Sequence, residues 1–547
     1  MRELLSYFNK KSKDQPESLK RQDVVLSKNI SVKNFSATKE NINTTVFACP
    51  GSGVKRSYLY PNMLQTNSSF VVMDYKREIY NAMKVFLKIN GYKVQILDVE
   101  KPLESDGYNP LRYCKTTYDV ENLVDCFKLP KGDSFSTGVL KKICCACIAF
   151  LTLNAPEETV PYCQLPSITG KKFYKPNPTL SDFFFMLEMA FSGNDKDYWS
   201  FVDLLKRIKH YESTTGKGYS YCLSNFVAYH NCSDAVIAAI YSQMSTILDN
   251  IKEAYPTEIA NNDGISIESF GTEKVAVFVN ISYVSQERLY LVRMFLYQVY
   301  SVLFRFSDKL IGSKKIVMPN GELVKWIPCE EANSPEVLSE IIKEYQDVTT
   351  EFNSYKGVYN VYSGKRNKIT SFPSPLITKK YVCAIKRVKV KDCIGCALPI
   401  PVRVFLNDID IIGEIPYLIN YMAVSRGVNI STTIITQSID ELKRVYGNHA
   451  QIILENCAYW LYMGASSPYR CDFLEDRIRL FHERKSNRGK LTNLGYNYSC
   501  ERLFNLPTDE MIIINNQKGE CWKDDKYVLE EHPNYKYLKN SNLYYPE

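Results

Sequence analysis

Short apolar runs alternate with amphipathic helical patterns along the first part of the chain. The apolar runs predict strands at 44–48, 69–74 and 92–97, and apolar residues at helical spacing predict a helix that begins near Tyr75 and ends at Gly91. Strands that are separated by helices pair in parallel through crossover connections. The pattern therefore predicts the α/β class, with a mostly parallel sheet covered by helices.

The pattern changes near Asn109-Pro110. From 118 to 259, apolar residues recur at helical spacing and strand patterns are few, which predicts an all-helical insertion. Four helices are expected within it, over 139–153, Leu180–Phe191, 198–211 and 235–254.

Strand patterns return in the second half of the chain. We predict a strand over 274–280, a long helix over 286–306, and strands over 401–408, Ile430–Thr436 and 459–464. Residues 477–494 are expected to form a charged loop, and Glu510–Asn515 and Val528 the last edge of the sheet. Residues 307–398 are an accessory insertion of unknown role, with a hairpin over 317–323 that turns at Asn320-Gly321 and a helix near 337–349. Residues 1–40 form a polar arm, in which 24–26 and 30–32 are candidate edge strands.

Composition narrows the class of protein. The 547 residues carry a formal net charge of +8, which permits an anionic partner such as nucleic acid without requiring one. The 17 cysteines are an odd number and no signal peptide precedes them, so we expect reduced thiols in a cytosolic protein. Cys393 and Cys396 form a single C-x-x-C, for which we expect a turn rather than a metal site. No apolar run approaches the roughly 18 residues of a membrane span.

A glycine-rich turn follows the first apolar strand. Its sequence over 48–57 is ACPGSGVKRS, and a short helical pattern follows that we expect Pro61 to interrupt. A strand, a glycine turn and a helix are the context in which backbone N–H groups bind phosphate. The pattern G-x-x-x-x-G-K-[ST] would place Gly at 48, Lys at 54 and Ser or Thr at 55. This chain has Ala48, Val54 and Lys55 there, so the turn is kept while the lysine and the hydroxyl are displaced or lost.

Polar residues end two later strands, where the second half of such a site is expected. The strand over 402–406 is followed by Asn407 and Asp408, where an Asp and a Glu would hold Mg²⁺ and orient water. An amide binds Mg²⁺ weakly because it has no charge, and Asp408 is one methylene shorter than Glu. Gln437 follows the next strand and is a candidate γ-phosphate sensor, and Arg426 is a candidate arginine finger that acts across a subunit interface. The alternatives are an Asx turn at the strand end and an ordinary surface arginine.

Further short motifs follow the glycine turn in a fixed order. They are Pro61-Asn62, Asp74-Tyr75-Lys76-Arg77-Glu78, Gly91-Tyr92-Lys93-Val94, Asn109-Pro110, Leu406-Asn407-Asp408-Ile409, Ile412-Gly413, Ile415-Pro416 and His532-Pro533-Asn534-Tyr535. In order and spacing, over about residues 26–535 except 307–398, they resemble the TraG/TraD family, the coupling proteins of type IV secretion and conjugation. In that family the second motif reads Asp-Pro-Lys-Gly-Glu, and the motif at 406–409 reads Leu-Asp-Glu-Phe.

The resemblance implies a RecA-like P-loop NTPase sheet with an inserted all-α domain. The nucleotide-binding domain would then comprise 41–117, 260–306 and 399–547. ATP and Mg²⁺ are the cofactors that the resemblance implies. The implied nucleotide-binding residues are Pro50, Gly51, Ser52, Gly53, Val54, Lys55, Arg56, Ser57 and Asn407, and the implied catalytic residues are Asp408, Gln437 and Arg426.

Departures from the family pattern bear on the chemistry. Val54 stands at the family lysine, Lys55 at its threonine, and Asn407 and Asp408 at its Asp and Glu. We therefore predict that ATP hydrolysis is absent or very weak, and that nucleotide binding is weak and largely independent of Mg²⁺. Lys55 or Arg56 is a candidate to replace the lost charge, since a long side chain one residue along reaches toward a phosphate.

Two functions in one machinery are compatible with these motifs. The first is a DNA-translocating motor subunit for conjugative DNA transfer, which by resemblance would form a homo-hexamer and face DNA or a relaxase–DNA complex, with type IV secretion components as partners. The second is a non-hydrolysing scaffold or adaptor paralogue. A P-loop-like module that binds no nucleotide is a third, unrelated hypothesis. The membrane helices typical of the family have no counterpart in this sequence, so we expect a cytoplasmic protein, peripheral at the membrane face.

Overall fold

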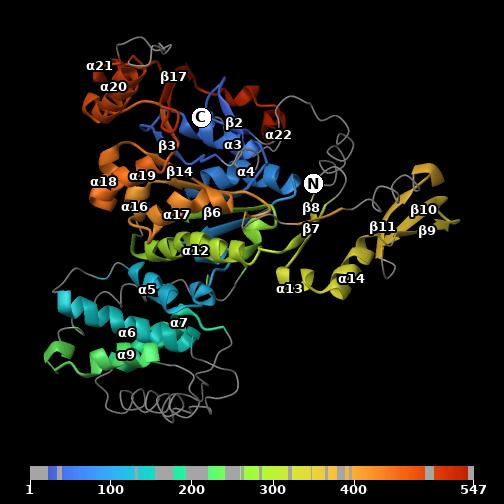
Figure 1. Ribbon diagram of the computed structural model, residues 1–547, viewed down its shortest axis with the longest axis horizontal. Helices are drawn as coiled ribbons and strands as arrows, with labels where there is room; N and C mark the ends of the chain where they lie inside the picture. Colours follow the sequence, from blue (N-terminus) through green and yellow to red (C-terminus); the bar gives the residue numbers. More distant parts are fainter. Residues whose placement is uncertain are drawn as a thin grey trace.

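The computed structural model describes most of the chain, with gaps. The described residues are 23–33, 40–127, 129, 134–153, 177–191, 220–233, 235–238, 240, 259, 264–281, 286–317, 323–346, 348–363, 367–377, 389–392, 397–486 and 498–539. Helices surround a central sheet, a further group of helices lies beyond α12, and small sheets project to one side (Figure 1). The predicted polar arm lies partly outside the described residues.

The central sheet has strand order β17-β16-β15-β3-β14-β13-β4-β6-β5. The bounds are β3 Thr44–Phe47, β4 Ser69–Tyr75, β5 Lys93–Asp98, β6 Val275–Ile281, β13 Val402–Asn407, β14 Ile430–Thr436, β15 Tyr459–Tyr462, β16 Glu510–Asn515 and β17 Glu520–Asp525. Neighbours pair in parallel from β15 to β5, and β16 and β17 join antiparallel at one edge. The predicted α/β class and the mostly parallel sheet are confirmed.

Both faces of the sheet are covered. Successive side chains of a strand point to opposite faces, so Phe70 and Val72 of β4 lie in one apolar core and Val71 and Met73 in the other. Helices α3 (Tyr60–Leu64), α4 (Glu78–Ile89) and α22 (Tyr535–Lys539) contribute to the first core, and α12 (Leu289–Asp308) contributes to the second. Strands that are buried on both faces read as continuous apolar runs, which is why the pattern alone located them.

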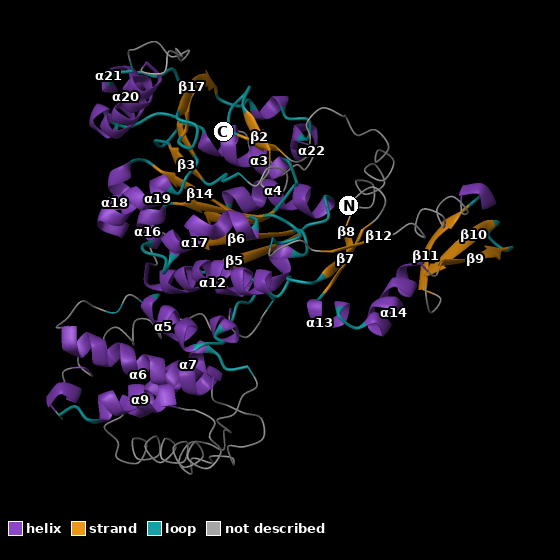
Figure 2. Cartoon of the chain, viewed as in Figure 1, coloured by secondary structure: helices purple, strands orange, loops and turns teal. Residues whose placement is uncertain are grey.

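Apart from the helices of residues 307–398, the remaining α-helices described form two groups. Around the sheet lie α16 Ile409–Ile412, α17 Leu418–Val424, α18 Ile439–Tyr446, α19 Ala450–Glu455, α20 Asp472–Ser486 and α21 Cys500–Phe504. Beyond α12 lie α5 Thr117–Asp125, α6 Ser134–Leu153, α7 Leu180–Phe191 and α9 Ser220–His230 (Figure 2). None of the described helices combines the length and the hydropathy that a membrane span requires.

The second group lies where the sequence predicts a helical insertion. Helix α6 contains the predicted 139–153, and α7 has the predicted bounds. The predicted helix over 198–211 and most of that over 235–254 lie outside the described residues. The domain boundaries stay a prediction.

Residues 307–398 contribute two small sheets. Strand β7 (Lys314–Val317) pairs with β8 (Leu323–Ile327) and β12 (Lys389–Asp392), and β9 (Val348–Asn353), β10 (Val358–Ser363) and β11 (Asn367–Phe372) form a meander. Helices α13 (Cys329–Ala332) and α14 (Pro335–Gln346) lie between them. The β7–β8 pairing agrees with the predicted hairpin, whose turn lies outside the described residues, as do Cys393 and Cys396. The predicted helix near 337–349 ends at Gln346, where β9 follows.

The predicted charged loop over 477–494 is wrong in its first part, because α20 extends to Ser486. Leu474, Ile478 and Phe481 are buried at helical spacing along α20. The many charged residues on the other side of the helix hid this stripe in the sequence.

Three smaller predictions also need correction. Pro61 does not interrupt the helix, since it occupies the first turn of α3, which follows the helical turn over Lys55–Leu59 directly. Val528 is not part of the edge strand, which is β17. The candidate edge strands in the polar arm form a separate antiparallel pair, β1 (Asp23–Val25) with β2 (Ser31–Lys33).

Asn62, of the Pro61-Asn62 motif, forms hydrogen bonds that connect α3 with β1 and β13. The fully buried Asn62 accepts from the Val25 N–H at 3.0 Å and donates to the Val25 carbonyl at 2.8 Å, which fixes β1 against α3. Its carbonyl oxygen also accepts from Arg403 Nη1 of β13 at 2.9 Å. This network anchors the segment that follows the glycine turn to the middle of the sheet.

Candidate functional site

The glycine turn lies at the carboxyl edge of the sheet. After β3 ends, the Ala48 N–H donates to Thr436 O of β14 at 3.0 Å, and the Cys49 N–H donates to Gly464 O, just after β15, at 3.2 Å. The turn therefore starts from a point held between two neighbouring strands.

Within the turn the Ser52 N–H donates to Cys49 O at 3.1 Å, but other hydrogen-bond donors have no acceptor among the described residues. Gly51 and Gly53 have φ angles of +81° and +78°, a left-handed conformation that glycine adopts without steric cost. Their N–H groups find no acceptor in the part of the chain that the structure describes, and the buried Ser52 hydroxyl has no hydrogen-bond partner there either. Successive N–H groups in such turns form concave anion sites, so the turn has the donors that a phosphate needs.

The basic residues after the turn are engaged elsewhere. Lys55 forms an ion pair with Glu78 at the start of α4, and Arg56 forms one with Glu530. Val54 precedes the helical turn over Lys55–Leu59, and the Ser57 N–H donates to Gly53 O at 2.9 Å. The structure thus keeps both cations near the turn but directs their charges to carboxylates.

Gln437 and Asn407 lie at the same edge as the turn. Phe47 of β3 pairs with Thr436 of β14, and Ile435 of β14 pairs with Asn407 of β13, so the three strand ends are level. Two strand spacings of about 4.8 Å separate β3 from β13. The carboxyl-edge arrangement that the sequence predicts for the turn, Gln437 and Asn407 is therefore present.

Asn407 and Asp408 bond to each other. Asn407 Nδ2 donates to Asp408 Oδ2 at 2.8 Å, and Asp408 has a left-handed φ of 55°. An amide therefore stands beside the acid, where the family pattern has two acids.

Gln437 has an arginine neighbour that the sequence did not indicate. Its N–H donates to Glu441 Oε2 at 2.8 Å, and its side-chain oxygen accepts from Arg470 Nη1 at 3.3 Å. Arg470 follows β15, the strand on the other side of β3. No local motif marks Arg470, because only the strand order brings it to this edge.

Arg426 lies at the opposite edge. It is exposed in the turn Ser425–Val428, which precedes β14, whereas Gln437 follows β14. A seven-residue strand spans about 20 Å, so Arg426 is remote from the glycine turn of its own chain. Its role across a subunit interface stays a prediction.

Lys526, which the sequence did not single out, reaches the turn from the C-terminal part of the chain. Its Nζ donates to Ser52 O at 2.9 Å and to Met463 O at 3.0 Å. The side chain is buried, and burial lowers the pKa of its ammonium group. Nothing in the sequence around Lys526 distinguishes it from the other lysines.

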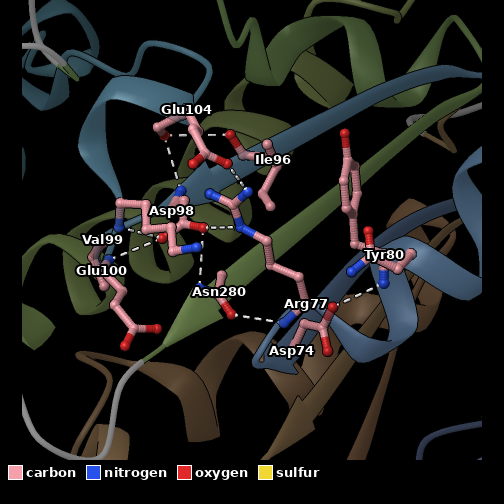
Figure 3. Close-up of polar contacts among 12 residues, drawn as sticks. Asp74, Arg77, Tyr80, Ile96, Asp98, Val99, Glu100, Glu104 and Asn280 are labelled. Carbon is pink, nitrogen blue, oxygen red and sulfur yellow. Dashed lines mark hydrogen bonds and ion pairs between the residues drawn. The ribbon is translucent and has the colours of Figure 1, made fainter.

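A second polar cluster closes the carboxyl ends of β4, β6 and β5 (Figure 3). Asp74, Asn280 and Asp98 are register partners on these three strands. The two oxygens of Asp74 accept the N–H groups of Ile79 and Tyr80 at the start of α4. Burial raises the pKa of Asp74 to about 6, against the lowering effect of these hydrogen bonds and of the Lys55 charge.

Arg77 connects this cluster, and its guanidinium points toward Asp98 and Glu104 (Figure 3). It forms ion pairs with both carboxylates, and its N–H donates to Asn280 Oδ1 at 3.1 Å. Asp98 also accepts from Asn280 Nδ2 at 3.0 Å. Arg77 has φ 58° at the position where the Asp-Pro-Lys-Gly-Glu pattern has glycine, so its side-chain contacts offset a backbone cost on the order of 1 kcal/mol or more. These contacts join the carboxyl ends of three strands to the start of α4.

The arrangement fits phosphate better than it fits a metal ion. Around the turn, unpaired N–H groups and an ammonium group supply donors for phosphate oxygens. For Mg²⁺, Lys55 stands at the place of the hydroxyl ligand and Asn407 at that of the acid, and no group of three potential metal ligands occurs among the described residues. The described residues at this edge therefore do not fit Mg²⁺.

Comparisons with known proteins agree on one family. A family model described as type IV secretory system conjugative DNA transfer matches residues 7–318, more than half of the chain. A second, described as the TraM recognition site of TraD and TraG, matches residues 401–476. No curated protein matches the chain by sequence.

Solved structures share the fold at low sequence identity. The bacterial conjugative coupling protein TrwBdeltaN70 in its unbound monoclinic form matches with a TM-score of 0.50 and 10% identity, over 96% of this chain and 91% of that one. Plasmid coupling protein TrwB in complex with the non-hydrolysable ATP analogue ADPNP matches with a TM-score of 0.50 and 10% identity, over 96% and 92%. At this identity the likeness establishes the fold.

Proposed function

The chain belongs to the type IV secretory system conjugative DNA transfer family, and from this membership we propose that it is a coupling subunit that binds a nucleoside triphosphate at residues 48–57 and hydrolyses it very slowly or not at all. Nucleotide occupancy, rather than rapid turnover, would then set its contacts with the transfer machinery.

One observation carries this proposal: the turn keeps the shape and the donors of a phosphate site while the residues for hydrolysis are replaced. The N–H groups of Gly51 and Gly53 and the Ser52 hydroxyl have no acceptors among the described residues. A TrwB structure of the same fold holds an ATP analogue, which supports a nucleotide as the phosphate source.

Slow chemistry follows from the electrostatics. Phosphoryl transfer needs a positioned lysine, Mg²⁺ held by a hydroxyl and an acid, and an oriented water. Val54 has no charge, Lys55 cannot bind Mg²⁺, and Asn407 is neutral and bonded to Asp408. Removal of one such group typically lowers a rate on the order of 100-fold or more.

The rival function is a motor subunit that hydrolyses ATP at a normal rate, and the intact order of strand ends around the turn favours it. In that case Lys55 or Arg56 would leave its exposed carboxylate partner on nucleotide binding, which costs little because exposed ion pairs contribute about 0–1 kcal/mol.

Partners follow from the same membership. We propose DNA or a relaxase–DNA complex as the cargo, other secretion components as neighbours, and a homo-hexamer in which Arg426 reaches the nucleotide site of the next subunit. The match of residues 401–476 to a TraM recognition site supports a protein contact in this part of the chain. Attachment at the cytoplasmic face of the membrane is part of the same proposal.

Equilibrium binding and turnover, measured on the same preparation, test the proposal. We expect ATP to bind with and without Mg²⁺ at similar affinity, and phosphate release to stay at the level of a protein-free control. The rival function would be established instead if the wild-type protein hydrolysed ATP at a typical motor rate and Lys55→Ala lost this activity.

A further inference from the structure

The ammonium group of Lys526 is buried against the glycine turn. Only 7% of Lys526 is exposed, and its Nζ donates to the carbonyls of Ser52 and Met463 at 2.9 and 3.0 Å. Its own N–H donates to Asp509 O at 2.6 Å, which fixes the backbone beside β16. Lys526 is thus held with its charge at the turn.

This charge has no carboxylate partner within ion-pair distance among the described residues. A buried ammonium is costly unless an opposite charge or several hydrogen bonds compensate it. It has three N–H donors, and the described residues supply acceptors for two of them. The third N–H has no acceptor among the described residues and is available to a bound ligand.

The donors without acceptors gather at one place. Lys526 contacts the carbonyl of Ser52, whose hydroxyl is buried and unpaired, and the unpaired N–H groups of Gly51 and Gly53 flank it in the sequence. Together they form a set of donors around which an anion with several oxygens would satisfy every member.

The segment that carries Lys526 is tied to the turn at a second point. Glu530 lies four residues after Lys526 and forms the ion pair with Arg56. Both Lys55 and Arg56 are engaged by carboxylates, and Val54 has no charge. Lys526 therefore differs from these neighbours in having an ammonium that is directed at the turn itself.

We propose that Lys526 is the phosphate-binding cation of this site, and that it supplies from the C-terminal part of the same chain the charge that Val54 does not supply. The ligand class is a nucleoside di- or triphosphate, whose β- or γ-phosphate oxygens accept from Lys526 Nζ, Ser52 Oγ and the N–H groups of Gly51 and Gly53. This inference rests on the proposed function, in which the turn binds nucleotide.

Lys526→Gln in the full chain is the first test. Glutamine removes the charge and keeps an N–H donor, one bond nearer the backbone than the lysine ammonium. We expect ATP affinity to fall about 10- to 100-fold, the size of one charged hydrogen bond, while adenosine binding is unchanged. Lys518→Met is the matched control, because Lys518 is an exposed lysine in the turn between β16 and β17, and it should bind ATP like wild type.

A rescue experiment separates the effect of the Lys526 charge from that of its hydrogen bonds to the turn. In the Lys526→Gln background, Val54→Lys returns a cation to the turn, and we expect it to restore ATP affinity to within a few-fold of wild type. If Lys526 only held the turn in shape, Val54→Lys would not rescue, and ATP and adenosine would weaken together in Lys526→Gln; either result overturns the proposal. Competition by inorganic triphosphate, with adenosine as the inactive counterpart, identifies the phosphate chain as the ligand.

The outcomes also separate this inference from the function on which it rests. Wild type and Val54→Lys that both fail to bind ATP would remove the proposed function and the role of Lys526 with it. Wild type that binds ATP, with Lys526→Gln equally tight, would remove the role of Lys526 alone. If Lys526→Gln does not fold, wild type is acetylated slowly and the extent of labelling at Lys526 is measured by peptide mass spectrometry. ATP, but not adenosine, should protect Lys526 from acetylation. Equal labelling with both ligands would overturn the proposal.

Discussion

Asn407 Nδ2 donates to Asp408 Oδ2 at 2.8 Å at the end of β13. The acid thus accepts a hydrogen bond from a neutral neighbour at the position where the family pattern has a second acid. A carboxylate in place of the amide would put two like charges in contact, which raises the pKa of one of them or recruits a cation.

Asn407→Asp should therefore make stability depend on Mg²⁺. We expect a melting temperature below that of wild type in chelator at neutral pH, recovered by several degrees in millimolar Mg²⁺, because a ligand that binds only the folded state stabilises it. Wild type and Asn407→Leu should respond by less than ~1 °C. An equal Mg²⁺ response in wild type would show that Asp408 already takes part in a metal site.

Restoring the whole motif should restore chemistry. In Val54→Lys, Lys55→Thr, Asn407→Asp, Asp408→Glu, we expect ATP affinity to rise and to become Mg²⁺-dependent, with measurable phosphate release, since the lost lysine, hydroxyl and acids all return. Addition of Arg426→Ala should lower turnover of the restored protein if the finger acts across subunits, without changing its melting temperature. No gain in affinity would contradict the placement of the site at residues 48–57.

Arg77 should be a major stabilising residue. Asp98 is fully buried, so Arg77→Met leaves its carboxylate without a cation, although three hydrogen bonds remain, and should lower the free energy of unfolding by about 3 kcal/mol. Asp98→Asn in the same background should recover part of the loss. The exposed pair of Lys55 with Glu78 is the control, and Lys55→Met should cost under about 1 kcal/mol. Similar midpoints of urea unfolding for Arg77→Met and wild type would rule out this role.

His532 should make the protein sensitive to acid. Burial lowers its pKa to about 4, and its Nε2 has no partner among the described residues. Because the folded state resists protonation, the stability is fully present above about pH 6.5 and is lost as the pH falls toward 4.

The measurement is the difference in unfolding free energy between wild type and His532→Phe across this range. It should change by up to about 1.4 kcal/mol per pH unit, in the direction that makes wild type weaker at low pH. The same change at the exposed His449 should leave the slope as in wild type. Parallel pH curves for wild type and His532→Phe would show that the imidazole does not control acid stability.

DNA binding should depend on salt. The net charge of +8 predicts modest affinity through phosphate contacts, and the logarithm of the binding constant should fall linearly with that of the salt concentration, by about 0.9 per phosphate contacted. Fluorescence anisotropy with a labelled oligonucleotide between about 50 and 200 mM salt measures this slope. Binding that is unchanged over this range would mean that the basic residues only solvate the surface.

Local patterns were sufficient for the buried strands of the sheet but did not locate its edge strand β17. Strands buried on both faces are continuous apolar runs, and a glycine-rich turn between a strand and a helix is the context of a phosphate loop, so residues 44–57 were placed by sequence alone. The order of motifs located Asn407 and Gln437 because parallel strands must end at one edge. Where charge masked the apolar stripe, as in α20, the local pattern was insufficient.

The tertiary structure alone decided which charges meet the turn. Lys526 and Ser52 are 474 residues apart in sequence, and no local signal links them, because their contact depends on the order β17-β16-β15-β3 across the sheet. Long-range packing likewise pairs Lys55 with Glu78 and Arg56 with Glu530. The sequence by itself determined that a turn of the phosphate-binding type follows β3, whereas long-range packing determined that the buried ammonium group of Lys526 lies against it.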